Sequence, residues 1–566
     1  MTGPRDRSDL VLLIAAILAG AFFFFSLDAL WPLATVDVTR EPAGVEAEAR
    51  TFLRARGVSI DGAEAAARLH VDERLLDYLQ RSFGLDETRA LIRRLPVYRY
   101  IVVAKQRGNP DVAFVAVDPA GGIIGWGRTL QEDAPGARLE ADAALALART
   151  AASHLGIDTS DWDSRGVSTT ERPERRDHYF TWERTISTEP ELRERLWVEV
   201  AGEVATADRR LVVPDSAVRD ARRRAAPNSA LFVAGALGAA FAGLVALALF
   251  LTHLRRGTVA LRPAAILVGI VALSFLTIQA LRPADLLQQW DPLWPRWIAT
   301  FQSLALSAAG GAWIAFILFV VIAAGDALDR ESGARRGASL WLAAAGKLTD
   351  PAVGRASLRG FLVGLLSGAA LSAAVLLLER FAGGWTPIQP QGFFFYAINS
   401  SAPAISTLVF FLMVALVEEL GYRFFAGTWL LGATGRAWIA ILIPAMLYGA
   451  THTGLGFLPP AEPFWGRAVA LTAVGCVWGW AFLRYDALTV VLSHFTADLF
   501  IFNWPRLESG DPDLILRAIA TIAVPLIPGV LWLLSTSRGG RGSFRGRKGG
   551  RSREMTGLAA EESQNA

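Results

Sequence analysis

Cysteine is almost absent from this 566-residue sequence, which contains only Cys476. A single cysteine excludes a disulfide within the chain and a metal cluster held by several thiolates. Charged residues are also sparse at 19%, and histidine occurs six times. The sequence is instead 52% hydrophobic, with a mean hydropathy of +0.35. This composition is typical of a protein that crosses a membrane several times.

Ten apolar segments approach the length of about twenty residues that a helix needs to cross a bilayer core. They are 10–27, 230–253, 261–281, 302–324, 358–378, 402–420, 437–452, 467–483, 487–503 and 514–534. No small-x-small cleavage signature follows the first segment, so we interpret residues 1–35 as an N-terminal membrane anchor. The predicted fold class is an α-helical polytopic membrane protein of about ten spans, with an inserted α+β extracytoplasmic domain.

Basic residues predict the orientation of these spans. The 325–359 loop and the tail at 535–566 are both rich in arginine, and ten spans place them on the same side. Loops rich in Arg and Lys stay in the cytoplasm, so we expect both termini to be cytoplasmic and residues 36–226 to be extracytoplasmic. The tail is rich in Gly and Arg, which predicts a disordered, basic cytoplasmic segment.

The polar region at 36–226 has an internally duplicated pattern. Its first half predicts a helix over 44–56, further helix to about Leu95, and two strands. Its second half predicts a helix over 141–155 followed by three strands. The predicted strands are 97–105, 111–117, 178–187, 196–200 and 205–213. This order weakly resembles two repeats of the PepSY type, which implies binding, inhibition or substrate capture. A structural role is the alternative.

Two adjacent carboxylates and an arginine lie within apolar sequence near the C-terminal third. Glu418 and Glu419 follow ten uninterrupted apolar residues, and Arg423 comes four residues after Glu419. Ionised groups in a membrane helix are costly and usually mark a functional site. Adjacent helical residues point about 100° apart, whereas the i,i+4 spacing allows an ion pair between Glu419 and Arg423. Glu418 then remains as a candidate general base.

Two further polar pairs lie in the apolar segments that follow. Tyr448 and His452 are four residues apart, as are His494 and Asp498. Each pair therefore shares one face of a helix. A single membrane histidine is more often a hydrogen-bonded packing residue than a catalytic one, and a lone Glu–Arg pair can simply join two helices. The three patterns together favour a polar reaction site inside the bilayer.

These three motifs occur in the order and approximate spacing of the CPBP intramembrane proteases, which include CAAX prenyl endopeptidases and bacteriocin-processing proteins. The resemblance covers about residues 355–505. We therefore assign residues 355–534 to a protease-like core and residues 227–354 to membrane helices with a cytoplasmic loop. Two positions differ from the family pattern. Tyr448 stands where Phe is common, and Asp498 stands where CAAX endopeptidases have Asn.

The resemblance implies an intramembrane endopeptidase in a bacterial plasma membrane, acting on membrane-associated or lipid-tethered peptides. Glu418 and His452 would activate water, and His494 with Asp498 would stabilise the oxyanion. Asp498 would have to be protonated or to orient His494. Glu419, Arg423 and Tyr448 would support the site. The family implies no metal, but Glu418, His452, His494 and Asp498 are also a ligand set that zinc accepts.

Two other classes of function remain open from the sequence. One is a non-catalytic scaffold or immunity protein of the same fold, and the other is a proton-coupled transporter. A transporter would be expected to contain inverted repeats with interrupted helices, and no such repeat is visible. No nucleic-acid partner is expected, and the sequence does not predict the oligomeric state. The expected spans place Glu418 near an inner end and His452 near an outer end, so their convergence requires a longer or broken helix.

Overall fold

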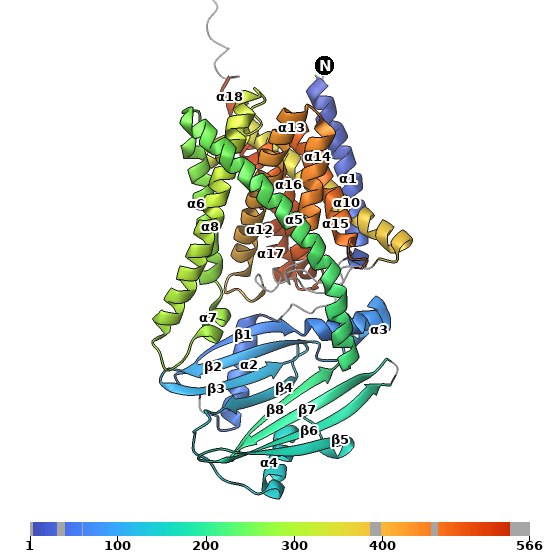
Figure 1. The fold of residues 1–566 in the computed structure, drawn as a ribbon, viewed down its shortest axis with the longest axis vertical. Coiled ribbons are helices and arrows are strands. Elements are labelled where there is room, and N and C mark those ends of the chain that lie inside the picture. The colour runs from blue at the N-terminus through green and yellow to red at the C-terminus, as the bar shows by residue number, and fades with distance from the viewer. Residues whose placement is uncertain are drawn as a thin grey trace, which may run out of the picture.

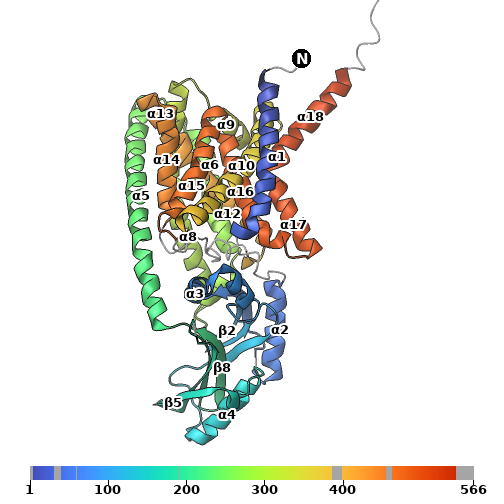
Figure 2. The ribbon, with the colours of Figure 1, turned by 90° about the vertical axis from the view of Figure 1, so that its right-hand side faces the viewer.

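A helical bundle and a sheet domain stack end to end in the computed structural model (Figure 1). The structure describes residues 4–30, 40–58, 60–188, 190–384, 398–453 and 462–543. The beginning of α1 and the far end of α18 lie at the end of the bundle opposite the sheet domain. The helix α9 of the arginine-rich 325–359 loop lies at that end too (Figure 2).

Long apolar helices build the bundle. Its elements are α1 (Pro4–Leu30), α5 (Asp215–Arg255), α6 (Leu261–Ala280), α8 (Arg296–Glu331), α10 (Pro351–Ala382), α12 (Pro403–Glu419), η3 (Leu420–Gly427), α13 (Thr428–Thr434), α14 (Ala437–Thr451), α15 (Gly466–Arg484), α16 (Ala487–Leu507), α17 (Pro512–Ala523), η4 (Val524–Leu526) and α18 (Ile527–Ser543), with short helices α7 (Pro283–Gln289) and α9 (Ala338–Ala344) in the connections.

The prediction of ten spans is confirmed only in part. Within the described ranges, nine helices are long and apolar enough to cross a membrane, which makes this a multi-pass membrane protein. The remaining predicted span, 437–452, corresponds to α14, which has 15 residues. It is therefore about 22 Å long, which is short for a hydrocarbon core of about 30 Å. The helix α18 continues to Ser543, nine residues into the segment from residue 535 whose disorder stays a prediction. Residues 544–566 lie outside the described part of the chain.

Among its described residues, the sheet domain contains eight antiparallel strands and three α-helices. They are α2 (Pro42–Ala55), β1 (Glu64–Val71), α3 (Glu73–Ile92), β2 (Tyr98–Gln106), β3 (Asn109–Val117), β4 (Ile123–Thr129), α4 (Ala141–Ser153), β5 (Asp163–Glu171), β6 (Arg176–Ser187), β7 (Leu192–Ala201) and β8 (Val204–Val212), with the short η2 (Thr159–Asp161) before β5. The strand order is β1-β2-β3-β4-β8-β7-β6-β5, so two four-stranded halves meet where β4 pairs with β8.

The predicted helix between residue 56 and Leu95 is wrong in its first part. Residues 64–71 form β1, which pairs antiparallel with β2 along its whole length. Three alanines near its start favour a helix in isolation. Pairing with β2 overrides that propensity because it buries the alternate residues Ala67, Leu69 and Val71 on one face.

Both halves bury the same face of the sheet beneath a helix. The helix α2 covers β1 to β3, and α4 covers β6 to β8. Trp126 lies at the seam on β4, where its ring contacts Phe52 of α2 and His154 at the end of α4. The halves thus share one continuous core. Their relation to PepSY repeats stays a prediction.

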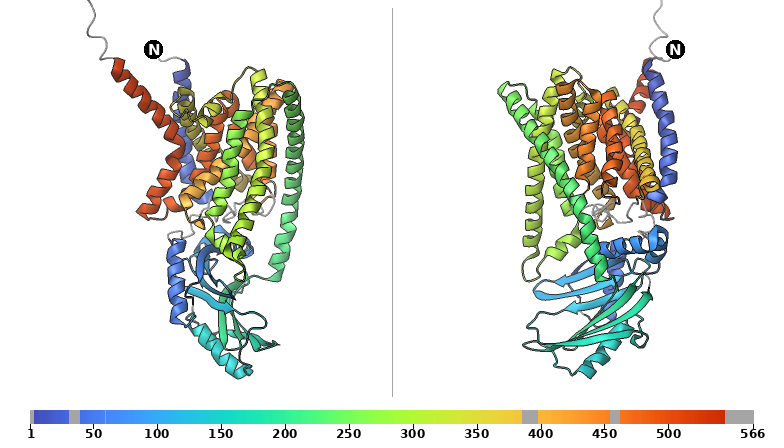
Figure 3. Two further views of the ribbon diagram at one scale, coloured as in Figure 1. Left: turned by 90° about the vertical axis from the view of Figure 1, so that its left-hand side faces the viewer. Right: turned by 45° about the vertical axis from the view of Figure 1, so that its right-hand side comes forward.

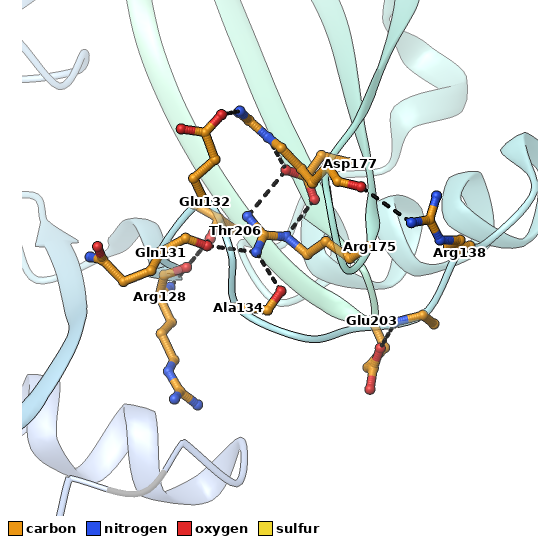
Figure 4. Close-up of polar contacts among 11 residues, drawn as sticks. Arg128, Gln131, Glu132, Ala134, Arg138, Arg175, Asp177, Glu203 and Thr206 are labelled. Atoms are coloured by element: carbon orange, nitrogen blue, oxygen red, sulfur yellow. Dashed lines mark hydrogen bonds and ion pairs between the residues drawn. The ribbon is translucent and has the colours of Figure 1, made fainter.

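A network of arginines and carboxylates fixes the connection between the halves (Figure 4). Arg175 is buried and donates hydrogen bonds to Asp177 at 2.8 Å and to the carbonyls of Gln131 and Ala134 at 2.6 and 2.8 Å. Arg172 joins Asp177 to Glu132. Because Asp177 is fully buried, these two guanidinium groups compensate for its desolvation. The linker before α4 is thereby tied to the turn before β6.

One long helix joins the sheet domain to the bundle. The helix α5 begins directly after β8 and runs for 41 residues along one side of the bundle, without a break at the predicted boundary of residue 226 (Figure 3). It packs on α14 and α8. A Cβ on Gly235 would lie only 2.8 Å from Ala450 of α14, so this glycine permits the close contact.

The outer edge of β1 docks on the bundle. Asn399, just before α12, accepts a hydrogen bond from the Leu69 N–H at 2.8 Å and donates one to the Leu69 carbonyl at 3.1 Å. Its amide thus satisfies a strand edge that would otherwise stay unpaired. Lys105 of β2 donates to the carbonyls of Gln288 and Trp290, and burial lowers the pKa of its ammonium group. Arg81 of α3 pairs with Glu462 at 2.8 Å.

Candidate active site

Glu418 lies at the middle of a single long span. The helix α12 continues without a break through η3 and α13, so the span covers Pro403–Thr434, of which Glu418 is the sixteenth of 32 residues. The expectation that this span ends near residue 420 is therefore wrong, and the expected mismatch in depth disappears. The segment η3 is a π-helix of eight residues that begins directly after Glu419. Widened helical turns of this kind are frequent at functional sites.

His452 reaches the same depth from the end of α14. It is the C-cap residue of this helix, which contains Pro444 in its interior. The Nδ1 atom of His452 lies 2.6 Å from the Tyr448 carbonyl oxygen. A carbonyl only accepts, so Nδ1 carries a proton and Nε2 is directed at Glu418.

The structure brings all four predicted catalytic residues together. Glu418 Oε1 lies 3.3 Å from His452 Nε2, and Glu418 Oε2 lies 3.7 Å from His494 Nε2. Asp498 Oδ2 lies 3.3 Å from the same His494 nitrogen. Glu418 therefore stands between the two imidazoles, which come from different helices. Its Oε2 atom is buried and has no hydrogen-bond partner among the described residues.

Glu419 has a second role beyond its ion pair. Its Oε1 atom accepts a hydrogen bond from Arg423 at 3.0 Å, as the i,i+4 spacing predicts. The same atom lies 2.8 Å from His494 Nδ1. Nδ1 must therefore donate, which leaves Nε2 facing Glu418 and Asp498. The two adjacent glutamates point in different directions, yet both reach His494, one from each nitrogen.

Aromatic rings enclose the charged groups. The Trp478 indole stacks on the His494 imidazole with centroids 4.1 Å apart and planes 20° apart. The Tyr448 ring lies 4.3 Å from that of His452. The guanidinium carbon of Arg423 is 4.8 Å from the Tyr448 centroid and 5.2 Å from that of Trp478, distances at which cation–π attraction contributes. Arg423 fits here because position 475 is glycine; a Cβ there would lie 2.7 Å from the Nη2 atom of Arg423.

Exposure divides the cluster into two groups. The side chains of Glu418, His452 and Asp498 are 17–24% exposed. Glu419, Arg423 and His494 are 2–3% exposed. The first group can meet a substrate, whereas the second forms the support behind it.

Three carboxylates face one arginine and two imidazoles, so the cluster is electrically neutral when both imidazoles are doubly protonated. Neutrality minimises the cost of burying these charges. In that state His494 Nε2 carries a proton to donate.

The four residues do not form a recognisable metal centre. Within the described part of the chain, no group of three or more His, Cys, Asp or Glu side chains is arranged to hold a metal ion. His494 Nδ1 is hydrogen-bonded to Glu419, and His494 Nε2 lies 3.3 Å from Asp498 and 3.7 Å from Glu418, so both ring nitrogens already face carboxylates. The alternative zinc ligand set of Glu418, His452, His494 and Asp498 therefore does not form a metal-binding arrangement among the described residues. Operation without a metal stays a prediction.

A cluster of carboxylates and imidazoles inside a bundle of apolar helices is the arrangement that an intramembrane hydrolase needs. The family model described as type II CAAX prenyl endopeptidase Rce1-like matches residues 399–500, which are 102 of the 566 residues. The matched segment contains all the predicted site residues. It confirms the resemblance and supports the assignment to the CPBP family. No curated protein and no solved structure matches the chain.

Two neighbours of the site were not predicted from the sequence. Trp478 is one of 18 tryptophans, and no motif distinguishes it from the others. Ser367 of α10, which accepts a hydrogen bond from the Trp478 indole at 2.9 Å, lies 127 residues before His494. Only the packing of α10, α15 and α16 brings these residues together.

Proposed function

We propose that this protein is a CPBP-type intramembrane endopeptidase that hydrolyses membrane-associated or lipid-tethered peptides with water activated by Glu418 and His452. The observation that supports the proposal most strongly is the position of Glu418. It lies in the middle of its span, between two imidazoles, and its buried Oε2 atom has no hydrogen-bond partner among the described residues. A carboxylate so placed can accept the proton of a reacting water.

The proton positions determine the roles of the residues. His452 Nδ1 donates to a carbonyl, so one proton is shared between its Nε2 and Glu418 Oε1. As water attacks the peptide carbonyl, this pair takes the water proton and later delivers it to the leaving amine. A doubly protonated His494 donates from Nε2 to the oxyanion that forms. Such a preorganised donor stabilises the transition state by several kcal/mol.

Asp498 competes for the proton that His494 needs. Its Oδ2 atom contacts the same Nε2 nitrogen that would donate to the oxyanion. Orientation of the ring is provided instead by Glu419 through Nδ1. We infer that Asp498 keeps His494 Nε2 protonated until substrate binds. The Asp498→Asn variant, which cannot carry a negative charge, tests this assignment by its effect on kcat.

The test compares Glu418→Gln with Glu379→Gln. The first removes the base without changing its shape, and the second alters an exposed carboxylate at the end of α10. Loss of a positioned base is expected to lower kcat by roughly 10²–10⁴-fold. Membrane proteomes of cells expressing each variant identify the substrate, which accumulates uncleaved only with Glu418→Gln or His452→Ala. Indistinguishable proteomes, with all variants folded, would instead favour a non-catalytic scaffold.

The finer features of localisation belong to the same proposal. We infer a bacterial plasma membrane from the family resemblance. We infer that both termini are cytoplasmic because the arginine-rich loop, the start of α1 and the far end of α18 lie at the same end of the bundle. The sheet domain at the opposite end is then extracytoplasmic. Protection of Arg74 and Arg89 from trypsin in intact spheroplasts would contradict this orientation.

A further inference from the structure

We propose that Trp478 is a positioning residue that fixes the plane of the His494 imidazole. The proposal rests on the proposed hydrolysis. A hydrogen bond from Nδ1 to Glu419 holds one edge of the ring but leaves the ring plane able to tilt. The indole face, 4.1 Å away and nearly parallel, removes this freedom. Together the two contacts aim Nε2 toward Glu418 and Asp498.

The indole is itself held through its N–H group. Its N–H donates to the Ser367 hydroxyl at 2.9 Å, and that hydroxyl donates its own proton to the Val363 carbonyl at 2.6 Å. The Ser367 oxygen also lies 3.3 Å from the hydroxyl of Ser493, the residue before His494. Each of these hydroxyls is buried. The tryptophan therefore has one orientation relative to α16.

Close packing of α10 makes this arrangement possible. A Cβ on Gly360 would lie 2.7 Å from Leu492, and one on Gly364 would lie 2.8 Å from Thr496. The two glycines let the backbone of α10 approach α16 closely, as small residues four apart commonly do in membranes. Ser367, on the following turn, can then reach both Trp478 and Ser493.

The position of Trp478 predicts an effect on chemistry rather than on binding. It is only 2% exposed, so it offers no surface to a substrate. Rotation of the His494 ring would misdirect the Nε2 proton, and small misplacements of a reacting group reduce the rate strongly. We therefore expect changes at Trp478 to lower kcat and to leave KM unchanged.

The experiment uses the full-length protein in liposomes with a panel of fluorescence-quenched, lipid-tethered peptides. Trp478→Leu removes the ring face and is expected to lower kcat about tenfold or more, with KM changed less than about twofold. Trp478→Phe keeps a ring face and is expected to retain most of the kcat that Trp478→Leu loses. The matched control is Trp480→Leu, two residues along α15 on the exposed side. Equal kcat values for Trp478→Leu and Trp480→Leu would overturn the proposal, as would equal losses in Trp478→Leu and Trp478→Phe.

A second measurement does not depend on activity. Solid-state NMR of protein labelled with ¹⁵N-histidine reports the two ring nitrogens, and the difference from a His494→Asn sample identifies the His494 signals. These signals should be sharp in the wild type and broadened in Trp478→Leu. Unchanged signals would overturn the proposal even if no peptide of the panel were cleaved. Full activity of Glu418→Gln would instead remove the proposed function, so the two failures are distinguishable.

Discussion

The buried pair of Glu419 and Arg423 allows a quantitative test of the support behind the site. Both side chains are 2% exposed, and they lie 3.0 Å apart. Arg423→Met leaves the carboxylate with His494 as its remaining partner, and Glu419→Gln leaves the guanidinium without its counter-ion. Removal of one member of a buried pair typically costs about 3–5 kcal/mol of unfolding free energy. We expect each single variant to be destabilised by that amount.

The double variant Glu419→Gln/Arg423→Met should be much more stable than the sum of the single changes predicts. It contains no uncompensated charge, and replacement of a buried ion pair by groups of similar size is often nearly neutral. Loss of the contacts between Arg423 and the rings of Tyr448 and Trp478 lowers the unfolding free energy of the double variant by about 1–2 kcal/mol. The expected coupling energy is therefore about 4 kcal/mol or more, well above the limit for independent sites.

Equilibrium unfolding in mixed micelles measures all four proteins of this cycle. Additive free energies would refute the reasoning, because they would show that the two charges do not depend on each other. Activity provides an independent readout. The double variant should be folded but should have lost most of its peptidase activity, since a glutamine at position 419 no longer holds His494 Nδ1 as a charged acceptor. A fully active double variant would show that this contact does not orient the ring.

Three further outcomes are expected. Asn399→Ala removes two hydrogen bonds to Leu69, each worth about 1 kcal/mol, so amide exchange along β1 should accelerate. Asn399→Asp keeps an acceptor and should retain protection of the Leu69 N–H. Equal exchange in the wild type and both variants would contradict this docking contact. Gly235→Ala places a Cβ 2.8 Å from Ala450 and should displace α14 and lower activity, whereas Gly243→Ala, which meets nothing within 4 Å, should not; equal effects would contradict the role of this contact. Purified protein should contain no stoichiometric metal and should keep its activity with strong chelators; loss of activity that added zinc restores would reverse the assignment.

Helical periodicity explains why so much of the site could be predicted from the sequence. The contact between Glu419 and Arg423 and the shared faces of the two other motifs depend only on i,i+4 spacing within one helix. The nine candidate spans follow likewise from apolar length, which the bilayer imposes locally. The family resemblance predicted at 355–505 includes the matched segment at 399–500 because the motifs that carry the resemblance lie in that segment.

Contacts between distant residues needed the tertiary structure. Glu419 binds His494 across 75 positions of sequence, and Asn399 caps Leu69 across 330. The alanines of residues 64–71 predict a helix, but this segment forms the strand β1 because it pairs with β2. Backbone geometry within a helix sets which side chains share a face, so the sequence determined the motifs and the spans. The packing of separate helices sets which faces meet, so only the tertiary structure determined that both glutamates converge on one histidine and that Trp478 lies against it.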